Sequence, residues 1–291
     1  EGEWFVCDVR QVGQAIEAVR NNEETLLQRI SDFKMRPEQR EAVSKTAEYF
    51  NLFAADKRNK GLTAHFLWNA KMRFGKTFTT YQLALSMGWR HILVLTFKPA
   101  VKTAWKEDLL THKDFAEWVF VEKKENREFN QVIDNQKFVC FASFQDVLGK
   151  NKVGGIKATN EWIQQVQWDC IILDEYHFGA WGKNAKDYYN KQDIATSIAA
   201  ETRNIYAEDA ASKKEMEARE AFDEGLMPLK TRHYLYLSGT PFRAIASGEF
   251  IEEQIYNWTY SDEQCAKYNW DNSKGRNPYL SLPKMVMLTY Q

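Results

Sequence analysis

The stretch AKMRFGKT at residues 70–77 decides the fold expected of this chain. An apolar run, HFLW at 65–68, precedes it, and apolar residues at helical spacing follow it. This order predicts a buried strand, a loop and a helix. Such a loop surrounds a phosphate chain with backbone N–H groups at a helix N-terminus, where the helix dipole also favours negative charge. The stretch therefore predicts a site for the phosphates of a nucleotide.

Two side chains of this loop have expected roles in binding. Lys76 is expected to neutralise the β- and γ-phosphates, and Thr77 to hold Mg²⁺ through its hydroxyl. Ala70 stands where the common pattern G-x-x-x-x-G-K-[ST] has its first glycine, which leaves the tightness of the turn open. The alternative is a chance Gly-Lys-Thr at the start of a helix. The residues expected to surround the nucleotide are Ala70, Met72, Arg73, Phe74, Gly75, Lys76 and Thr77.

Composition narrows the class of protein. The chain has 291 residues, of which 44% are hydrophobic and 27% charged, so it can bury the core of a large α/β domain. Its net charge of −1 argues against a uniformly basic nucleic-acid-binding protein, and any contact with nucleic acid should be local. Two of the four scattered cysteines lie inside apolar strand-like runs, which indicates reduced, mostly buried thiols and a cytoplasmic protein, and no C-x-x-C spacing suggests zinc. No apolar stretch or leader predicts a membrane or secretory role.

A second apolar run, WDCIIL at 168–173, ends in Asp174-Glu175-Tyr176-His177. Carboxylates at the carboxyl ends of parallel strands lie where the ligand crevice of such a sheet is found. Asp174 is expected to hold Mg²⁺ through water, and Glu175 to orient and deprotonate the attacking water. The spacing to the phosphate loop supports one shared site.

A third apolar run, HYLYL at 233–237, ends in SGTPFR at 238–243. Ser238 and Thr240 would lie on a sharp turn at the same sheet edge, where they can hydrogen-bond His177 and report the state of the phosphate site. We expect a coupling role for them. An ordinary turn is the alternative.

Residues 70–77, 174–177 and 238–241, in this order and each after an apolar run, resemble motifs I, II and III of superfamily-2 helicases and translocases of the DExH kind. The SGTPF form, with the RPEQ at 36–39, resembles most closely the motor subunits of type I and type III restriction enzymes. The resemblance covers roughly residues 33–245. It implies a RecA-like α/β domain, with a mainly parallel sheet flanked by helices, that hydrolyses ATP with Mg²⁺ and moves on double-stranded DNA. The catalytic residues that it implies are Lys76, Asp174, Glu175 and His177.

The same resemblance implies further contacts. In the RPEQ run, Gln39 together with Arg36 would read the adenine of ATP, although a solvent-facing first helical turn is the alternative. Lys98 follows the apolar run at 91–96 in the position of motif Ia, which meets the phosphodiester backbone. Ser143 and Gln145 resemble the Ib region. A solvated loop at Lys98 and a plain helix cap at Ser143 are the alternatives there.

The expected organisation has three parts. Residues 1–32 form a helical lead-in, either an ordinary packing segment or the tail of a preceding domain. Residues 33–260 form the RecA-like ATPase domain, with a helical insertion at 183–230. Residues 261–291 extend towards a second RecA-like domain that is absent, whose arginine finger is worth about 10³–10⁵ in rate. The chain, which opens without a methionine, should be a piece that alone binds nucleotide weakly and hydrolyses it poorly.

The leading expectation is an ATP-driven DNA helicase or translocase of the restriction type. A nuclease, a specificity subunit and a methyltransferase are its candidate partners. An RNA-directed DExH helicase is one alternative, and a nucleotide-gated nucleic-acid-binding module without turnover is another. Glu175 speaks against the second alternative, because a mere switch does not need a water-activating acid.

Overall fold

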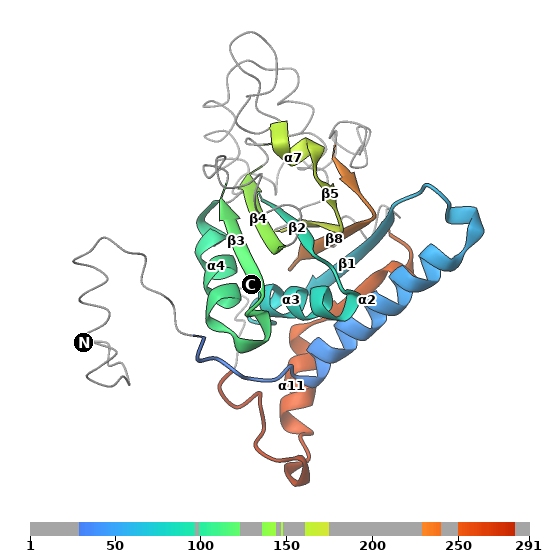
Figure 1. Ribbon diagram of the computed structural model, residues 1–291. Coiled ribbons are helices and arrows are strands. Elements are labelled where there is room, and N and C mark those ends of the chain that lie inside the picture. Colours follow the sequence, from blue (N-terminus) through green and yellow to red (C-terminus); the bar gives the residue numbers. More distant parts are fainter. Residues whose placement is uncertain are drawn as a thin grey trace, which may run out of the picture.

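A wholly parallel seven-stranded sheet organises the computed structural model, whose described residues are 29–96, 99–122, 136–143, 147, 161–174, 229–239 and 250–282. The strand order is β3-β4-β2-β6-β8-β1-β9 (Figure 1). The expected α/β class with a mainly parallel sheet is therefore confirmed. The strands of this sheet are β1 (Ala64–Ala70), β2 (His91–Thr96), β3 (Trp118–Glu122), β4 (Lys137–Ser143), β6 (Cys170–Leu173), β8 (His233–Ser238) and β9 (Ile255–Trp258).

The central strands are apolar throughout because both faces of the sheet are covered. In β2, Ile92 and Val94 belong to one hydrophobic cluster, whereas Leu93 and Leu95 belong to the cluster on the other face. All four residues of β6 are buried. The apolar run at 91–96 forms one strand of this sheet. The run at 168–173 is divided: Cys170–Leu173 form β6 of the large sheet, whereas Trp168 belongs to a short strand that pairs separately.

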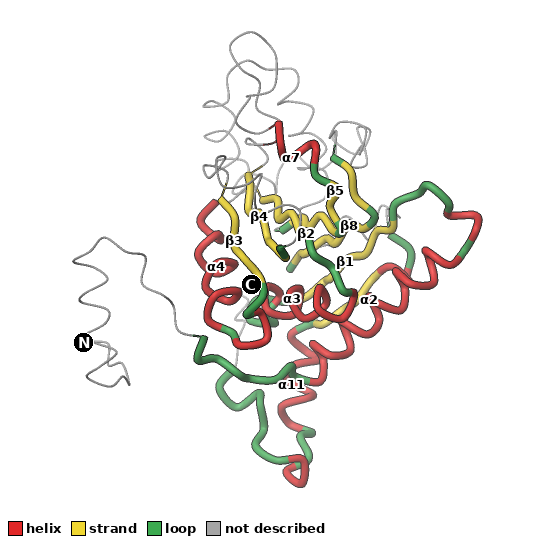
Figure 2. Tube along the Cα trace, viewed as in Figure 1, coloured by secondary structure: helices red, strands yellow, loops and turns green. Residues whose placement is uncertain are grey.

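Three helices cover one face of the sheet. Figures 1 and 2 show α2 (Pro37–Ala55), α3 (Lys76–Met87) and α4 (Lys102–Thr111) on the same side, with α7 (Glu161–Gln165) on the opposite side. The short strands β5 (Gln167–Trp168) and β7 (Lys230–Thr231) form a separate parallel pair. None of the helices in the described ranges is long and apolar enough to cross a bilayer.

The sheet does not end at the strand that carries the phosphate loop. Strand β9 pairs in parallel with β1, and α11 (Tyr260–Tyr268) follows it directly. Thr259 caps α11, because its side chain accepts from the backbone N–H of Asp262 and the Asp262 carboxylate accepts from the backbone N–H of Thr259. Residues 250–282 thus pack against the strand that leads into the loop.

Several expectations fall outside the described residues. They concern the lead-in before residue 29, the helical insertion up to residue 228 and the last residues from 283 onwards. The three-part domain organisation accordingly stays a prediction. Shorter helical turns lie in the described ranges at η1 (Lys57–Asn59), η2 (Pro99–Val101), η3 (Lys113–Phe115), η6 (Glu252–Gln254) and η7 (Asn272–Lys274).

Candidate nucleotide-binding site

The phosphate loop connects β1 to α3, as the strand, loop and helix pattern predicted. Two of its residues have left-handed backbones, Gly75 with φ +82° and Arg73 with φ +68°. Glycine adopts this conformation without cost, whereas other residues pay about 1–2 kcal/mol. Arg73 is the one non-glycine residue with positive φ in the described part of the chain. The loop is therefore strained at Arg73 and needs support from its surroundings.

Ala70 resolves the question of the missing first glycine. It is fully buried, still extended as the last residue of β1, and it pairs with Trp258 of β9. The next backbone N–H, of Lys71, donates to the Trp258 carbonyl at 3.2 Å. Any residue adopts an extended conformation, so the loop needs no glycine at this position.

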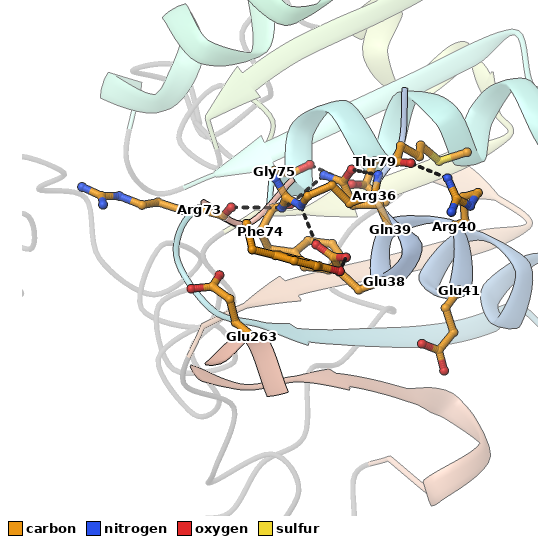
Figure 3. Close-up of polar contacts among 12 residues, drawn as sticks. Arg36, Glu38, Gln39, Arg40, Glu41, Arg73, Phe74, Gly75, Thr79 and Glu263 are labelled. Atoms are coloured by element: carbon orange, nitrogen blue, oxygen red, sulfur yellow. Dashed lines mark hydrogen bonds and ion pairs between the residues drawn. The ribbon is translucent and has the colours of Figure 1, made fainter. Parts of the chain in front are cut away.

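Arg36 and Gln39 hold the strained part of the loop from outside (Figure 3). The Arg36 guanidinium donates to the Phe74 carbonyl at 2.7 Å and to the Arg73 carbonyl at 3.2 Å. The Gln39 amide donates to the same Phe74 carbonyl at 2.8 Å. Arg36 and Gln39 thus offset the backbone strain of the loop with three hydrogen bonds.

The amide oxygen of Gln39 accepts from the Arg36 backbone N–H at 2.8 Å, which makes Gln39 part of the cap of α2. An amide nitrogen has two N–H groups and its oxygen two lone pairs, so one of each is left over for a ligand. Reading adenine through Gln39 stays a prediction. Its contact with the phosphate loop is a role that the sequence did not reveal.

Glu38 was not singled out from the sequence, yet it is 2% exposed at the centre of a polar network. Its carboxylate accepts from Arg36 Nε at 2.5 Å and from the Tyr279 hydroxyl at 2.7 Å. The hydroxyl of Tyr256 donates to the Glu38 carbonyl at 2.9 Å. Burial is the main cause that raises the pKa of Tyr279, and the hydrogen bond to Glu38 raises it further. Burial also raises the pKa of Tyr256, and the charges of Glu41 and Glu38 add to this effect. Both hydroxyls therefore remain protonated donors at neutral pH.

A cleft of about 260 Å³ opens between the phosphate loop and the end of β6. Lys76 and Thr77 line it from one side and Asp174 lines it from the other. The Lys76 ammonium donates to the Ala70 carbonyl at 2.9 Å, so it lies across the loop. The remaining lining residues are Lys71, Arg73, Phe74, Gly75, Val101, Ala104 and Trp105.

The residues of the cleft suit a nucleotide with a divalent cation. The first N–H groups of α3 have no partner within the helix, and they face the loop together with the positive end of the helix dipole. Lys76, Thr77 and Asp174, which carry an ammonium, a hydroxyl and a carboxylate, line the same opening. This donor set matches phosphate oxygens and the oxygen ligands that Mg²⁺ prefers.

Trp105 of α4 contacts Asp174 directly. Its indole Nε1 donates to Asp174 Oδ2 at 2.8 Å, and both side chains are buried. The hydroxyl of Tyr81 donates to the Trp105 carbonyl at 2.8 Å. Burial is the main cause that raises the pKa of Tyr81, and nearby carboxylates raise it further. No local signal in the sequence links Trp105 to Asp174, because the two residues are 69 positions apart.

The other predicted site residues divide into two groups. Ser238 is aligned with Asn69 at the carboxyl end of β8, and Ser143 is aligned with Thr96 at the end of β4. Both lie at the sheet edge that carries the phosphate loop. The predicted residues that lie outside the described residues are Lys98, Gln145, Glu175, His177 and Thr240.

This fold and this loop define a RecA-like domain of the superfamily-2 helicase class found in restriction enzymes. Residues 32–207 match the family described as "Type III restriction enzyme, res subunit". The match spans more than half of the 291 residues, and the chain belongs to this family.

A relative from Mycoplasma pneumoniae (strain ATCC 29342 / M129 / Subtype 1) is 29% identical over 266 residues, and is described as "Putative type II restriction enzyme and methyltransferase RM.MpnORF110P C-terminus". The alignment covers 88% of this chain and 35% of the relative, so the chain spans about a third of that relative's length.

Two solved structures are similar over most of the chain. A nuclease-deletion mutant of the type ISP restriction-modification enzyme LlaGI, in complex with a DNA substrate mimic, has a TM-score of 0.43 and 13% identity, with 83% of this chain and 21% of that chain covered. The SWI2/SNF2 ATPase core domain of Sulfolobus solfataricus has a TM-score of 0.41 and 14% identity, with 89% and 43% covered.

Proposed function

We propose that this chain is the first RecA-like motor domain of an ATP-driven DNA translocase of the restriction type. The observation that carries the proposal is the cleft between the phosphate loop and β6, which Lys76, Thr77 and Asp174 line together. Membership of the restriction-enzyme family supports DNA rather than RNA as the track. The description of the Mycoplasma relative supports nuclease and methyltransferase partners.

In this proposal the backbone N–H groups at the start of α3 hold the phosphates. The Lys76 ammonium leaves the Ala70 carbonyl and neutralises the β- and γ-phosphates. Thr77 and Asp174 are the residues that would hold Mg²⁺. When bound, the metal neutralises charge that develops on the transferred phosphoryl group.

Four further residues have roles that rest on the motif pattern. Glu175 would orient the attacking water and take its proton, and Ser238 and Thr240 would hydrogen-bond His177 and so transmit the state of the site. The residues proposed to contact the DNA backbone are Lys98, Ser143 and Gln145.

The proposed reaction needs a second RecA-like domain. An arginine finger from such a domain contributes about 10³–10⁵ in rate. We therefore propose that residues 1–291 alone bind ATP and turn it over slowly, and that full activity belongs to the intact protein.

Binding of a fluorescent ATP analogue, measured with Mg²⁺ and with EDTA, tests the nucleotide site. We expect Lys76→Ala to abolish binding. In the intact protein, Glu175→Gln should retain binding and lose turnover. Normal hydrolysis by Glu175→Gln would contradict the assignment of the base.

A second measurement tests the track. ATP hydrolysis by the intact protein should rise with duplex DNA and not with RNA. Stimulation by RNA alone would favour an RNA-directed helicase, and nucleotide binding without any turnover would favour a gated binding module.

A further inference from the structure

We propose that Trp105 is a positioning residue for Asp174, because its indole N–H fixes the carboxylate in the orientation that magnesium requires. The inference rests on the proposed nucleotide site and adds a residue to it. The two residues lie 69 positions apart in the chain and on different elements, α4 and the end of β6. The contact therefore exists only because the fold packs α4 against this edge of the sheet.

The hydrogen bond is well placed to orient the carboxylate. Trp105 Nε1 lies 2.8 Å from Asp174 Oδ2, with Trp105 1% exposed and Asp174 6% exposed. Little water can compete at such a site, and a hydrogen bond to an ionised acceptor is stronger there than at the surface. The indole is a donor only, so the polarity of the contact is fixed.

Asp174 needs such a donor because its carboxylate rotation is intrinsically soft. The terminal torsion of an aspartate has a broad range of angles, whereas a metal site requires one orientation. The backbone of Asp174 is fixed by its N–H, which donates to the Leu95 carbonyl at 2.9 Å. A fixed backbone does not by itself set the torsion of the carboxylate. The indole N–H selects the angle.

The indole can select that angle because its surroundings hold Trp105 in place. The Tyr81 hydroxyl donates to the Trp105 carbonyl at 2.8 Å. The two rings pack edge to face, with centroids 5.5 Å apart and an interplanar angle of 85°. Tyr81 lies on α3, which begins at the phosphate loop. Trp105 therefore links the helix that begins at the loop to the carboxylate on the opposite side of the cleft.

In a purely structural role, Asp174 would serve only to accept the hydrogen bond of a buried indole N–H. The two roles predict different effects of magnesium on the loss of nucleotide binding. Loss of a structural contact lowers stability and affects nucleotide binding equally with and without the metal. Loss of a positioning contact affects the metal-dependent part alone.

Trp105→Phe in the intact protein separates them, because phenylalanine keeps an aromatic ring and removes the donor. Binding of the fluorescent ATP analogue is measured in EDTA and in a magnesium titration, together with the melting temperature. We expect affinity in EDTA to change by a smaller factor than the magnesium dependence does. The magnesium concentration at half-maximal binding should rise about 10-fold, the lower end of the range for groups that orient metal ligands.

Trp118→Phe is the matched control. Trp118 is also buried, at 3% exposed, and its indole N–H finds no partner in the described ranges. It lies on β3 and does not line the cleft. This variant should leave the magnesium midpoint unchanged, which shows whether replacing any buried indole has the same effect.

A double variant tests whether Trp105 acts through the carboxylate. In an Asp174→Ala background, Trp105→Phe should produce no further change in magnesium dependence. An unchanged midpoint in the single variant, or equal losses with and without metal, overturns the inference and leaves the proposed function intact. A wild-type protein that binds no nucleotide under any condition overturns the proposed function itself.

Discussion

Lys71 of the phosphate loop and Glu263 of α11 form an ion pair with Nζ and Oε1 2.5 Å apart. The Glu263 side chain is 1% exposed, and its second oxygen has no hydrogen-bond partner within the described part of the chain. Lys71 also lies over the ring of Tyr260, 5.3 Å from its centroid. Helix α11 thus holds the entry of the loop, while Arg36 and Gln39 hold its far end.

This ion pair shows that residues after 260 support the phosphate loop. From the sequence, residues 261–291 were expected to lead away from the ATPase domain. The expected boundary after residue 260 passes through the first turn of α11, which begins at Tyr260. Tyr279, further along, donates to Glu38, 241 residues away. The segment 250–282 therefore supports the phosphate loop from two directions.

Removing one partner of the Lys71–Glu263 pair should be worse than removing both. Lys71→Met leaves the deeply buried Glu263 carboxylate unpaired, and we expect a loss of about 3 kcal/mol in the free energy of unfolding. Glu263→Gln should cost less, because Lys71 is more exposed and can reach water. The double variant should recover most of the stability. Urea unfolding measures this, and strictly additive losses would show that the pair is not coupled.

Gly75→Ala should disturb the loop more than the same change at another left-handed glycine. A Cβ on Gly75 would lie 2.7 Å from Gln39 Nε2, whereas at Gly88, with φ +65°, it would meet nothing within 4 Å. Both changes carry the backbone cost of about 1–2 kcal/mol. Only Gly75→Ala also displaces the amide that holds the Phe74 carbonyl, so it should lose roughly 1 kcal/mol more.

Thermal unfolding of the two glycine variants measures that difference. Adding Gln39→Ala to Gly75→Ala should cost less than Gln39→Ala costs in the wild-type protein, because the amide is already displaced from the Phe74 carbonyl. Equal stability of the Gly75→Ala and Gly88→Ala variants would mean that Gln39 moves aside freely.

Arg36→Met should weaken nucleotide binding although Arg36 need not touch the nucleotide. The change removes two hydrogen bonds to the Arg73 and Phe74 carbonyls and the ion pair with Glu38. At about 1 kcal/mol for each of the two hydrogen bonds, the loss is about 2 kcal/mol, so we expect the affinity to fall by roughly 30-fold. Titration of the fluorescent ATP analogue measures it.

Arg40→Met is the control for that change. Arg40 lies on the same helix, is exposed, and donates to the Met35 carbonyl rather than to the loop. Its replacement should leave both affinity and stability within about 0.5 kcal/mol of wild type. If the two arginine variants bind alike, the loop does not depend on Arg36.

Stability should fall below neutral pH in part because of His233. Its Nδ1 donates to the Asp169 carbonyl at 2.7 Å, which fixes the neutral tautomer. Burial lowers the pKa of His233 from its usual 6.5, so the unfolded chain takes up a proton more readily than the folded one. The contribution of His233 is thus complete above the unfolded pKa and is lost as pH falls through the folded pKa.

His233→Asn keeps an N–H donor near the Nδ1 position and removes the titration. Melting temperatures at pH 7.5 and pH 5.5 should show a smaller drop in this variant than in wild type. An equal drop would assign the acid sensitivity to other groups.

The sequence was sufficient for the central strands, the loop and the class of fold, but not for β9 or for the separation of Trp168 into β5. Apolar runs at residues 91–96 and 168–173 are local signals, because a strand covered on both faces must be apolar along its whole length. The spacing of Lys76 and Thr77 after β1 is local too. Since parallel strands end at one edge of a sheet, the sequence alone predicts Asp174 at the same edge as the loop.

Tertiary structure alone decided how the loop is supported. Lys71 and Glu263 are 192 residues apart, and Trp105 and Asp174 are 69 apart, so neither pair has a spacing that a sequence pattern can reveal. Which buried donor meets which carboxylate depends on how α4 and α11 pack against the sheet edge. Local periodicity determines that an element forms and which face it buries, whereas side-chain partners depend on distances set by the packed core.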